Sequence, residues 1–155
     1  MILKRPESVL IVLYNEYNKV LVLQRIDDAS FWQSVTGTME VGEVPIQTAA
    51  REVLEETGIN LSFAHTNEAG FLHHLMDCRL VNQYLIREDW LYRYPKGVTK
   101  NFEYVFCAQV PANSTIILTE HTAYEWLNKQ DAMAKVWSGT NKWAISQFVP
   151  KTIDA

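Results

Sequence analysis

The stretch of residues 37–59 constrains this chain more than any other. Three of its carboxylates, Glu52, Glu55 and Glu56, stand at positions i, i+3 and i+4, a spacing that places side chains on one face of a helix. Like charges at this spacing destabilise an isolated helix by roughly 0.2–0.5 kcal/mol per pair. A bound divalent cation would remove this repulsion. Ligands that are all oxygen atoms favour Mg²⁺, with Mn²⁺ as a substitute, over zinc.

The same stretch carries the signals of a helix from Pro45 to Thr57. Proline is tolerated in the first turn of a helix, and Gly58 follows where a left-handed C-terminal cap is expected. We expect an apolar face opposite the acids, formed by Ile46, Ala49, Ala50 and Val53. Two adjacent glutamates alone would indicate only a solvated helix surface, so the inference of a metal site rests on the whole stretch.

This stretch resembles the Nudix box, the signature of the Nudix hydrolase family. Every defining position of the box is matched, namely Gly37, Glu43, Arg51, Glu52, Val53, Glu55, Glu56, Gly58 and Ile59. The resemblance implies one Nudix domain over residues 1–155, an α/β fold (α+β) in which an α-β-α sandwich surrounds a mixed β-sheet. It also implies that Glu52 and Glu56 bind the metal and that Glu55 is a further ligand or the proton acceptor. Arg51 would orient a catalytic carboxylate, either Glu55 or Glu43.

The resemblance continues outside the box, toward family members that act on dihydroneopterin triphosphate. It covers most of the chain, with its most specific segments at residues 31–37 (FWQSVTG) and 119–121 (TEH). It implies a pyrophosphohydrolase of folate biosynthesis that forms dihydroneopterin monophosphate and pyrophosphate. Glu120 would be a further metal ligand, and Lys4, Arg25 and Thr36 would bind the substrate. Residues 84–87 would cover the substrate, and the stretch between Trp126 and Trp137 looks shorter than in such relatives.

Two other functions stay open at this point. A house-cleaning pyrophosphohydrolase for nucleoside triphosphates, including oxidised ones, would use the same chemistry, because pterin and purine rings share similar hydrogen-bonding edges. A non-catalytic binding module would have no need for the three facing carboxylates. Phe31 and Trp32 are either core residues or a stacking platform for the pterin.

Composition limits the class of partner. The chain has 155 residues, of which 48% are hydrophobic, and a formal net charge of −4. This charge argues against binding a nucleic acid polymer, and no apolar run approaches the roughly 20 residues that span a membrane. Cys78 and Cys107 are too few for a disulfide framework, so we expect a reduced, cytoplasmic protein. Its partner would be a small-molecule triphosphate, and it would be a monomer or a weak homodimer.

Apolar and β-branched runs predict three strands, at residues 8–14, 20–25 and 102–110. The first two strands would form a hairpin. Weaker signals leave three further segments as strand-like or mixed, at residues 61–75, 79–90 and 115–118. The adjacent His73 and His74 would point to opposite faces of a strand and would make a poor metal pair.

The end of the chain has the signals of two helices. A short helix is expected near residues 129–136, and an amphipathic one at residues 140–149. On the second helix we expect four side chains to face the core: Trp143, Ala144, Ile145 and Phe148.

Overall fold

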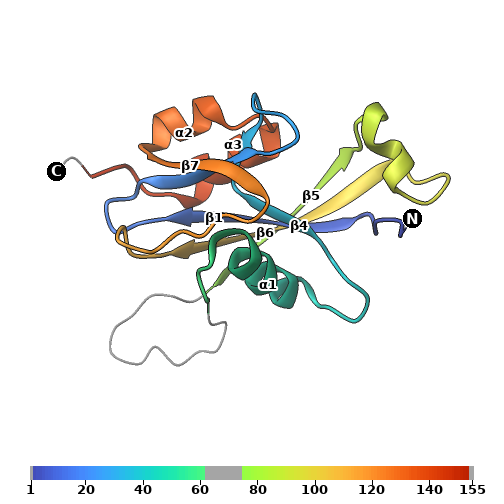
Figure 1. Ribbon diagram of the computed structural model, residues 1–155, viewed down its shortest axis with the longest axis horizontal. Helices are drawn as coiled ribbons and strands as arrows, with labels where there is room; N and C mark the ends of the chain where they lie inside the picture. Colours follow the sequence, from blue (N-terminus) through green and yellow to red (C-terminus); the bar gives the residue numbers. More distant parts are fainter. Residues whose placement is uncertain (1, 62–74, 154–155) are drawn as a thin grey trace.

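The computed structural model describes residues 2–61 and 75–153. It contains a seven-stranded sheet with α1 on one face and α2 and α3 on the other (Figure 1). The expected α-β-α sandwich is therefore confirmed. The elements, in chain order, are β1 (Glu7–Tyr14), β2 (Val20–Arg25), β3 (Trp32–Gln33), β4 (Val35–Thr38), α1 (Pro45–Thr57), β5 (Met76–Leu85), the 3₁₀ helix η2 (Glu88–Arg93), β6 (Lys100–Gln109), β7 (His121–Leu127), α2 (Lys129–Lys135) and α3 (Gly139–Phe148).

The central strand β1 makes the sheet mixed. It runs parallel to β6, from Glu7 opposite Phe102 to Tyr14 opposite Gln109, and antiparallel to β2 and β4. The main path of the sheet is β3-β2-β1-β6-β5, and β7 pairs with β2. The expected hairpin of β1 and β2 is present, but it pairs only at Tyr14 and Val20, because β4 occupies the same edge of β1 further along.

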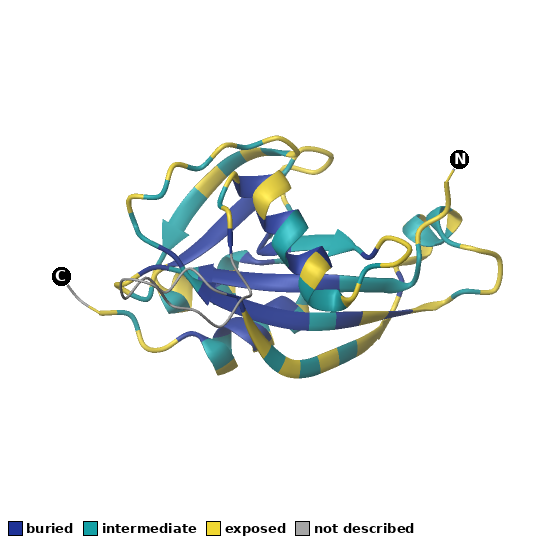
Figure 2. Ribbon diagram, turned by 90° about the horizontal axis from the view of Figure 1, so that it is seen from below, coloured by how far each residue is buried: buried dark blue, intermediate teal, exposed yellow. Residues whose placement is uncertain are grey.

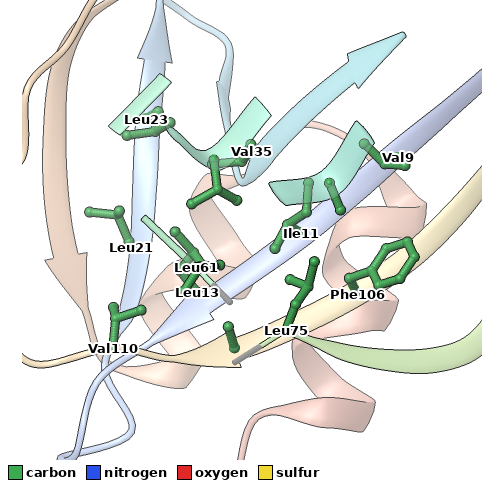
Figure 3. Packing of buried hydrophobic residues seen from close by; sticks show 13 residues of the cluster. Val9, Ile11, Leu13, Leu21, Leu23, Val35, Leu61, Leu75, Phe106 and Val110 are labelled. Carbon is green, nitrogen blue, oxygen red and sulfur yellow. The ribbon is translucent and has the colours of Figure 1, made fainter. Parts of the chain in front are cut away.

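Both faces of β1 are buried, which explains its uninterrupted apolar sequence. Successive side chains of a strand point to opposite faces. Val9, Ile11 and Leu13 pack with Ala49 and Val53 in the cluster beneath α1 (Figure 3). The alternate side chains pack with buried residues of α2 and α3 in a second cluster.

Helix α1 has the predicted bounds and the predicted cap. Gly58 has φ +80°, and its N–H donates to the carbonyl of Leu54 at 2.9 Å. The expected apolar face packs on the sheet, but of the three acids only Glu55 lies on a solvated face. Glu52 and Glu56 are 8% and 1% exposed, so α1 buries two of its three clustered carboxylates. Figure 2 shows the exposed residues of α1 as separate yellow segments between buried and intermediate ones.

Two further expectations were wrong. Residues 115–118 form no strand, and the strand of this region is β7, which begins at His121. Trp143 is 55% exposed, whereas Ala144 and Ile145 are fully buried and Phe148 packs against the core. The helical period explains this result, because a residue directly before the buried Ala144 is rotated about a quarter turn away from the core.

Most of the mixed segment 61–75, including His73 and His74, lies outside the described residues. The uncertain segment 79–90 is resolved into the end of β5 and the start of η2. Within the described part of the chain, no helix is both long and apolar enough to cross a membrane.

Candidate active site

Two carboxyl groups of α1 lie together in a buried position. Glu52 and Glu56 are one helical turn apart and nearly inaccessible to solvent. Burial raises the pKa of Glu56 well above its usual range, and the neighbouring Glu52 raises it further. Burial also raises the pKa of Glu52. Because two close carboxylates cannot both ionise cheaply, the pair favours the binding of a further positive charge.

Arg51 connects the acidic residues of this region. Its Nε and Nη2 donate to the two oxygens of Glu43 at 2.7 and 2.9 Å. Its Nη1 donates to Glu52 Oε1 at 2.7 Å and to Glu55 Oε2 at 3.2 Å. The planar guanidinium fixes these directions. Glu43 is thus the anchor of Arg51, which in turn orients Glu52 and Glu55.

The loop before β7, together with the first residue of β7, brings three residues toward the end of α1. The Thr119 hydroxyl donates to the carbonyl of Glu55 at 2.6 Å and ties the loop to the helix. Glu120 is exposed, and its charge contributes to the raised pKa of Glu56. His121 Nε2 lies 3.6 Å from Glu56 Oε1. Burial and then Arg25 lower the pKa of His121, so its imidazole is neutral at pH 7.

Glu52 and Glu56 fit a divalent cation. Glu56 Oε2 is buried and has no hydrogen-bond partner among the described residues, and Gly37 leaves the space that the Glu52 carboxyl group occupies. Carboxylate oxygens are ligands that Mg²⁺ and Mn²⁺ prefer. Three acidic or imidazole side chains do not converge on one point in the described residues, and Glu55 is paired with Arg51.

A cavity of about 490 Å³ lies beside this acidic region. Lys4, Arg25 and Arg93 line one part of it. Partial desolvation, Arg93 and Arg25 lower the pKa of Lys4, whereas Glu52 and Glu120 raise it. Because Glu52 and Glu120 act on the pKa of Lys4, the basic part of the cavity adjoins the acidic residues. Arg25 is held in place by Asp27, to whose two oxygens its Nε and Nη2 donate at 2.7 and 2.6 Å.

Aromatic side chains form another wall of the cavity. Trp90 and Trp137 both line it, and their rings meet edge to face at a centroid distance of 5.7 Å. Phe31 stacks on Trp137 at 4.8 Å, but neither Phe31 nor Trp32 lines the cavity. The guanidinium of Arg87 lies 4.8 Å from the centroid of Trp90.

The structure brings most of the expected site residues together. Thr36 lines the cavity, and its Oγ1 accepts a hydrogen bond from Gln33 at 3.1 Å. Residues 84–87 also line the cavity, as do Trp137 and Ser138. Sequence reasoning assigned no role to His121, Trp90 or Trp137. For His121 a signal existed, because it belongs to the matched TEH segment.

Comparisons with known proteins agree with this geometry. The NUDIX domain family model matches residues 4–148. The dihydroneopterin triphosphate diphosphatase of Escherichia coli K12 is 44% identical over 147 residues, which cover 94% of this chain and 93% of that protein. The enzyme of the same name from Haemophilus influenzae is 35% identical over 94% of this chain and 89% of its own. A solved structure of the E. coli dihydroneopterin triphosphate pyrophosphohydrolase matches with a TM-score of 0.84 and 43% identity, covering 96% of this chain and 98% of that one.

Proposed function

Since this chain belongs to the NUDIX family and is a Nudix hydrolase, we propose that it hydrolyses dihydroneopterin triphosphate to dihydroneopterin monophosphate and pyrophosphate. The observation that carries the proposal is the 44% identity to an enzyme of that name over nearly the full length of both chains. The proposed reaction would belong to folate biosynthesis. The non-catalytic alternative is set aside, because the relatives are enzymes and the acidic residues of the box are intact.

The proposed cofactor is Mg²⁺, which Glu52 and Glu56 would hold. The buried carboxyl pair and the unpartnered Glu56 Oε2 support this assignment. A bound divalent ion supplies positive charge for the phosphate oxygens and makes nearby water more acidic. Glu55 and Glu120 are the proposed additional ligands. Glu55 is also a candidate proton acceptor, because it is more exposed than the pair and its oxygen is positioned by Arg51.

Arg51 has a positioning role in this proposal. Its charge is permanent. Its partly buried hydrogen bonds to Glu43 and Glu52 keep the guanidinium in one orientation. It therefore holds the Glu52 carboxylate in place while the charge on the substrate changes.

The triphosphate would lie at the basic end of the cavity. Lys4 and Arg25 are the proposed phosphate contacts, supported by their position beside the acidic residues. Positive side chains fixed in advance stabilise the negative charge that develops during phosphoryl cleavage. The pterin would then lie between the aromatic wall and Thr36.

A second candidate is hydrolysis of nucleoside triphosphates to nucleoside monophosphates. A cavity of about 490 Å³ with two tryptophans on its wall is also suited to a purine. The two free cysteines support a reducing, cytoplasmic setting for either substrate.

The test is a comparison of kcat/KM for dihydroneopterin triphosphate and for a panel of ribo- and deoxynucleoside triphosphates, with Mg²⁺ present. We expect the pterin to be preferred by at least about tenfold over each nucleotide, a ratio that one hydrogen bond to a charged group can supply. A flat profile, or one preferred nucleotide, would reject the pterin assignment and leave the Nudix chemistry intact.

A further inference from the structure

Glu103 is a buried carboxylate that the mechanism does not use. It lies on β6, is 5% exposed, and lines the cavity. In the register of the sheet it stands beside Ser8 of β1. Tyr104 and Val9, the next pair along, belong to the cluster beneath α1. Because side chains alternate along a strand, Glu103 points to the face opposite α1, away from Glu52 and Glu56.

Within the described residues, no cationic side chain pairs with Glu103. None of the ion pairs formed by residues 2–61 and 75–153 includes it. Its Oε1 accepts one hydrogen bond, from Asn82 Nδ2 at 3.2 Å. Burial raises the pKa of Glu103, and the neighbouring Thr140 and Asn82 oppose that shift. A carboxylate can accept about four hydrogen bonds, so Glu103 can accept further ones. Burying a charged group without such partners costs free energy.

The surroundings of Glu103 select the kind of group that it would accept. The ionised carboxylate of Glu103 can only accept hydrogen bonds. A second acceptor is Asn101 Oδ1, which has no partner among the described residues. Asn101 lies two residues before Glu103 on the same face of β6. A ligand that fits here presents adjacent N–H donors. Trp137 and Trp90, which line the same cavity, favour a flat ring.

We propose that Glu103 recognises the amino group and the adjacent ring N–H of a 2-amino-4-oxopyrimidine ring, as found in pterins and in guanine. Two parallel hydrogen bonds from such an edge to one carboxylate match the bidentate geometry that makes carboxylates selective. Glu103 would therefore be a specificity-determining residue rather than a catalytic one. This inference rests on the proposed function, and it predicts guanine nucleotides as the best substitutes for the pterin.

The first test removes either the amino group of the ligand or the carboxylate of Glu103. GTP carries the amino group and ITP lacks it, so the ratio of their kcat/KM values measures its recognition. We expect the wild-type protein to prefer GTP by at least about tenfold, because a site built for a hydrogen bond rejects an analogue that cannot form it. Glu103→Gln should bring the ratio close to one and raise KM for the pterin substrate more than it lowers kcat.

The matched control is Glu125→Gln, an equally conservative change on β7 at a partly exposed carboxylate that pairs with Lys135 outside the cavity. Its GTP to ITP ratio should equal that of the wild type. The melting temperature of Glu103→Gln should be unchanged or higher, since the change removes a buried charge. A folded Glu103→Gln protein that keeps the full GTP preference would overturn the proposal.

A binding measurement decides the matter if neither nucleotide is turned over. Pterin and lumazine differ in that lumazine has an oxo group in place of the amino group, and fluorescence titration gives the affinity of each. Pterin should bind at least about tenfold more tightly to the wild type, and equally to Glu103→Gln. Equal binding of the two compounds to the wild type would reject the role of Glu103, whereas a low kcat/KM for the pterin triphosphate alone would reject only the proposed substrate.

Discussion

Gly37 of β4 lies directly against the carboxyl group of Glu52 on α1. A Cβ atom at position 37 would overlap the Glu52 carboxyl carbon, so any other residue there would force the Glu52 carboxyl group to move. Gly37 pairs with Val9 of β1 in the sheet, so the backbone at this point cannot easily retreat. The glycine of the box is thus a spatial requirement of the carboxylate that follows fifteen positions later.

Gly37→Ala should therefore displace Glu52 and abolish most activity. We expect kcat/KM to fall by about a hundredfold or more, since a small misplacement of a catalytic group has effects of that size. Gly42→Ala is the control, because a Cβ there meets no neighbour and adds only the strain of φ +84°, about 1–2 kcal/mol. Steady-state kinetics and melting temperatures of both proteins check the prediction, and a fully active Gly37→Ala enzyme would contradict it.

The Glu43–Arg51 pair should make stability depend on pH in the acid range. Hydrogen bonding from Arg51 lowers the pKa of Glu43 from 4.5 to about 2. A depressed folded-state pKa means that the stabilisation is complete above about pH 4.5 and is lost as the pH falls toward 2. Glu43→Gln should lower the free energy of unfolding by about 1–2 kcal/mol at pH 7, and the difference from the wild type should shrink below pH 4.5.

Urea unfolding of both proteins at a series of pH values from 7 to 3 measures this difference. A difference that stays constant over that range would show that Glu43 stabilises the fold through something other than its charge.

Mg²⁺ should stabilise the wild-type protein and have little effect on Glu56→Gln. A ligand that binds only the folded state at a hundred times its Kd adds about 2.7 kcal/mol. The metal-free Glu56→Gln protein should be at least as stable as the metal-free wild type, because it lacks a buried ionisable group beside Glu52. Thermal unfolding with increasing Mg²⁺ checks both statements, with Glu125→Gln as a control that should respond like the wild type. Equal stabilisation of Glu56→Gln would remove Glu56 from the metal site.

Lys4→Gln should weaken substrate binding more than it slows turnover. Lys4 lies beside Arg93 and Arg25 in the cavity, and its backbone N–H donates to the carbonyl of Arg93 at 2.7 Å, a bond that the substitution leaves in place. We expect KM to rise about tenfold with a smaller change in kcat, the pattern for loss of uniform binding. Lys19→Gln, an exposed lysine that does not line the cavity, should behave like the wild type.

The sequence predicted local structure well where one short segment determines it. The box helix, its glycine cap and the apolar strands β1, β2 and β6 were all expected, because proline, glycine and β-branched runs act locally. Strand β7 was missed, since its alternating residues are only half-buried and give a weak signal. Trp143 was misplaced because its apolar character was given more weight than its position on the helix.

The candidate site divides in the same way. The resemblance predicted Glu52, Glu55, Glu56 and Arg51 as site residues. It did not predict which hydrogen bonds join them. The burial of Glu103 could not be inferred, because it depends on β1, β5 and α3 meeting around β6, far apart in the chain. The pairing of Arg51 with Glu43, Glu52 and Glu55 at once likewise depends on the path of the loop before α1.

The most direct test of the account is to identify the products of the purified protein acting on dihydroneopterin triphosphate with Mg²⁺. ³¹P NMR distinguishes pyrophosphate from orthophosphate, and Glu56→Gln provides the background rate. We predict dihydroneopterin monophosphate and pyrophosphate in equal amounts, with a rate at least about a hundredfold above that of Glu56→Gln. Stepwise release of orthophosphate, or a wild-type rate no higher than that of Glu56→Gln, would contradict the proposed activity.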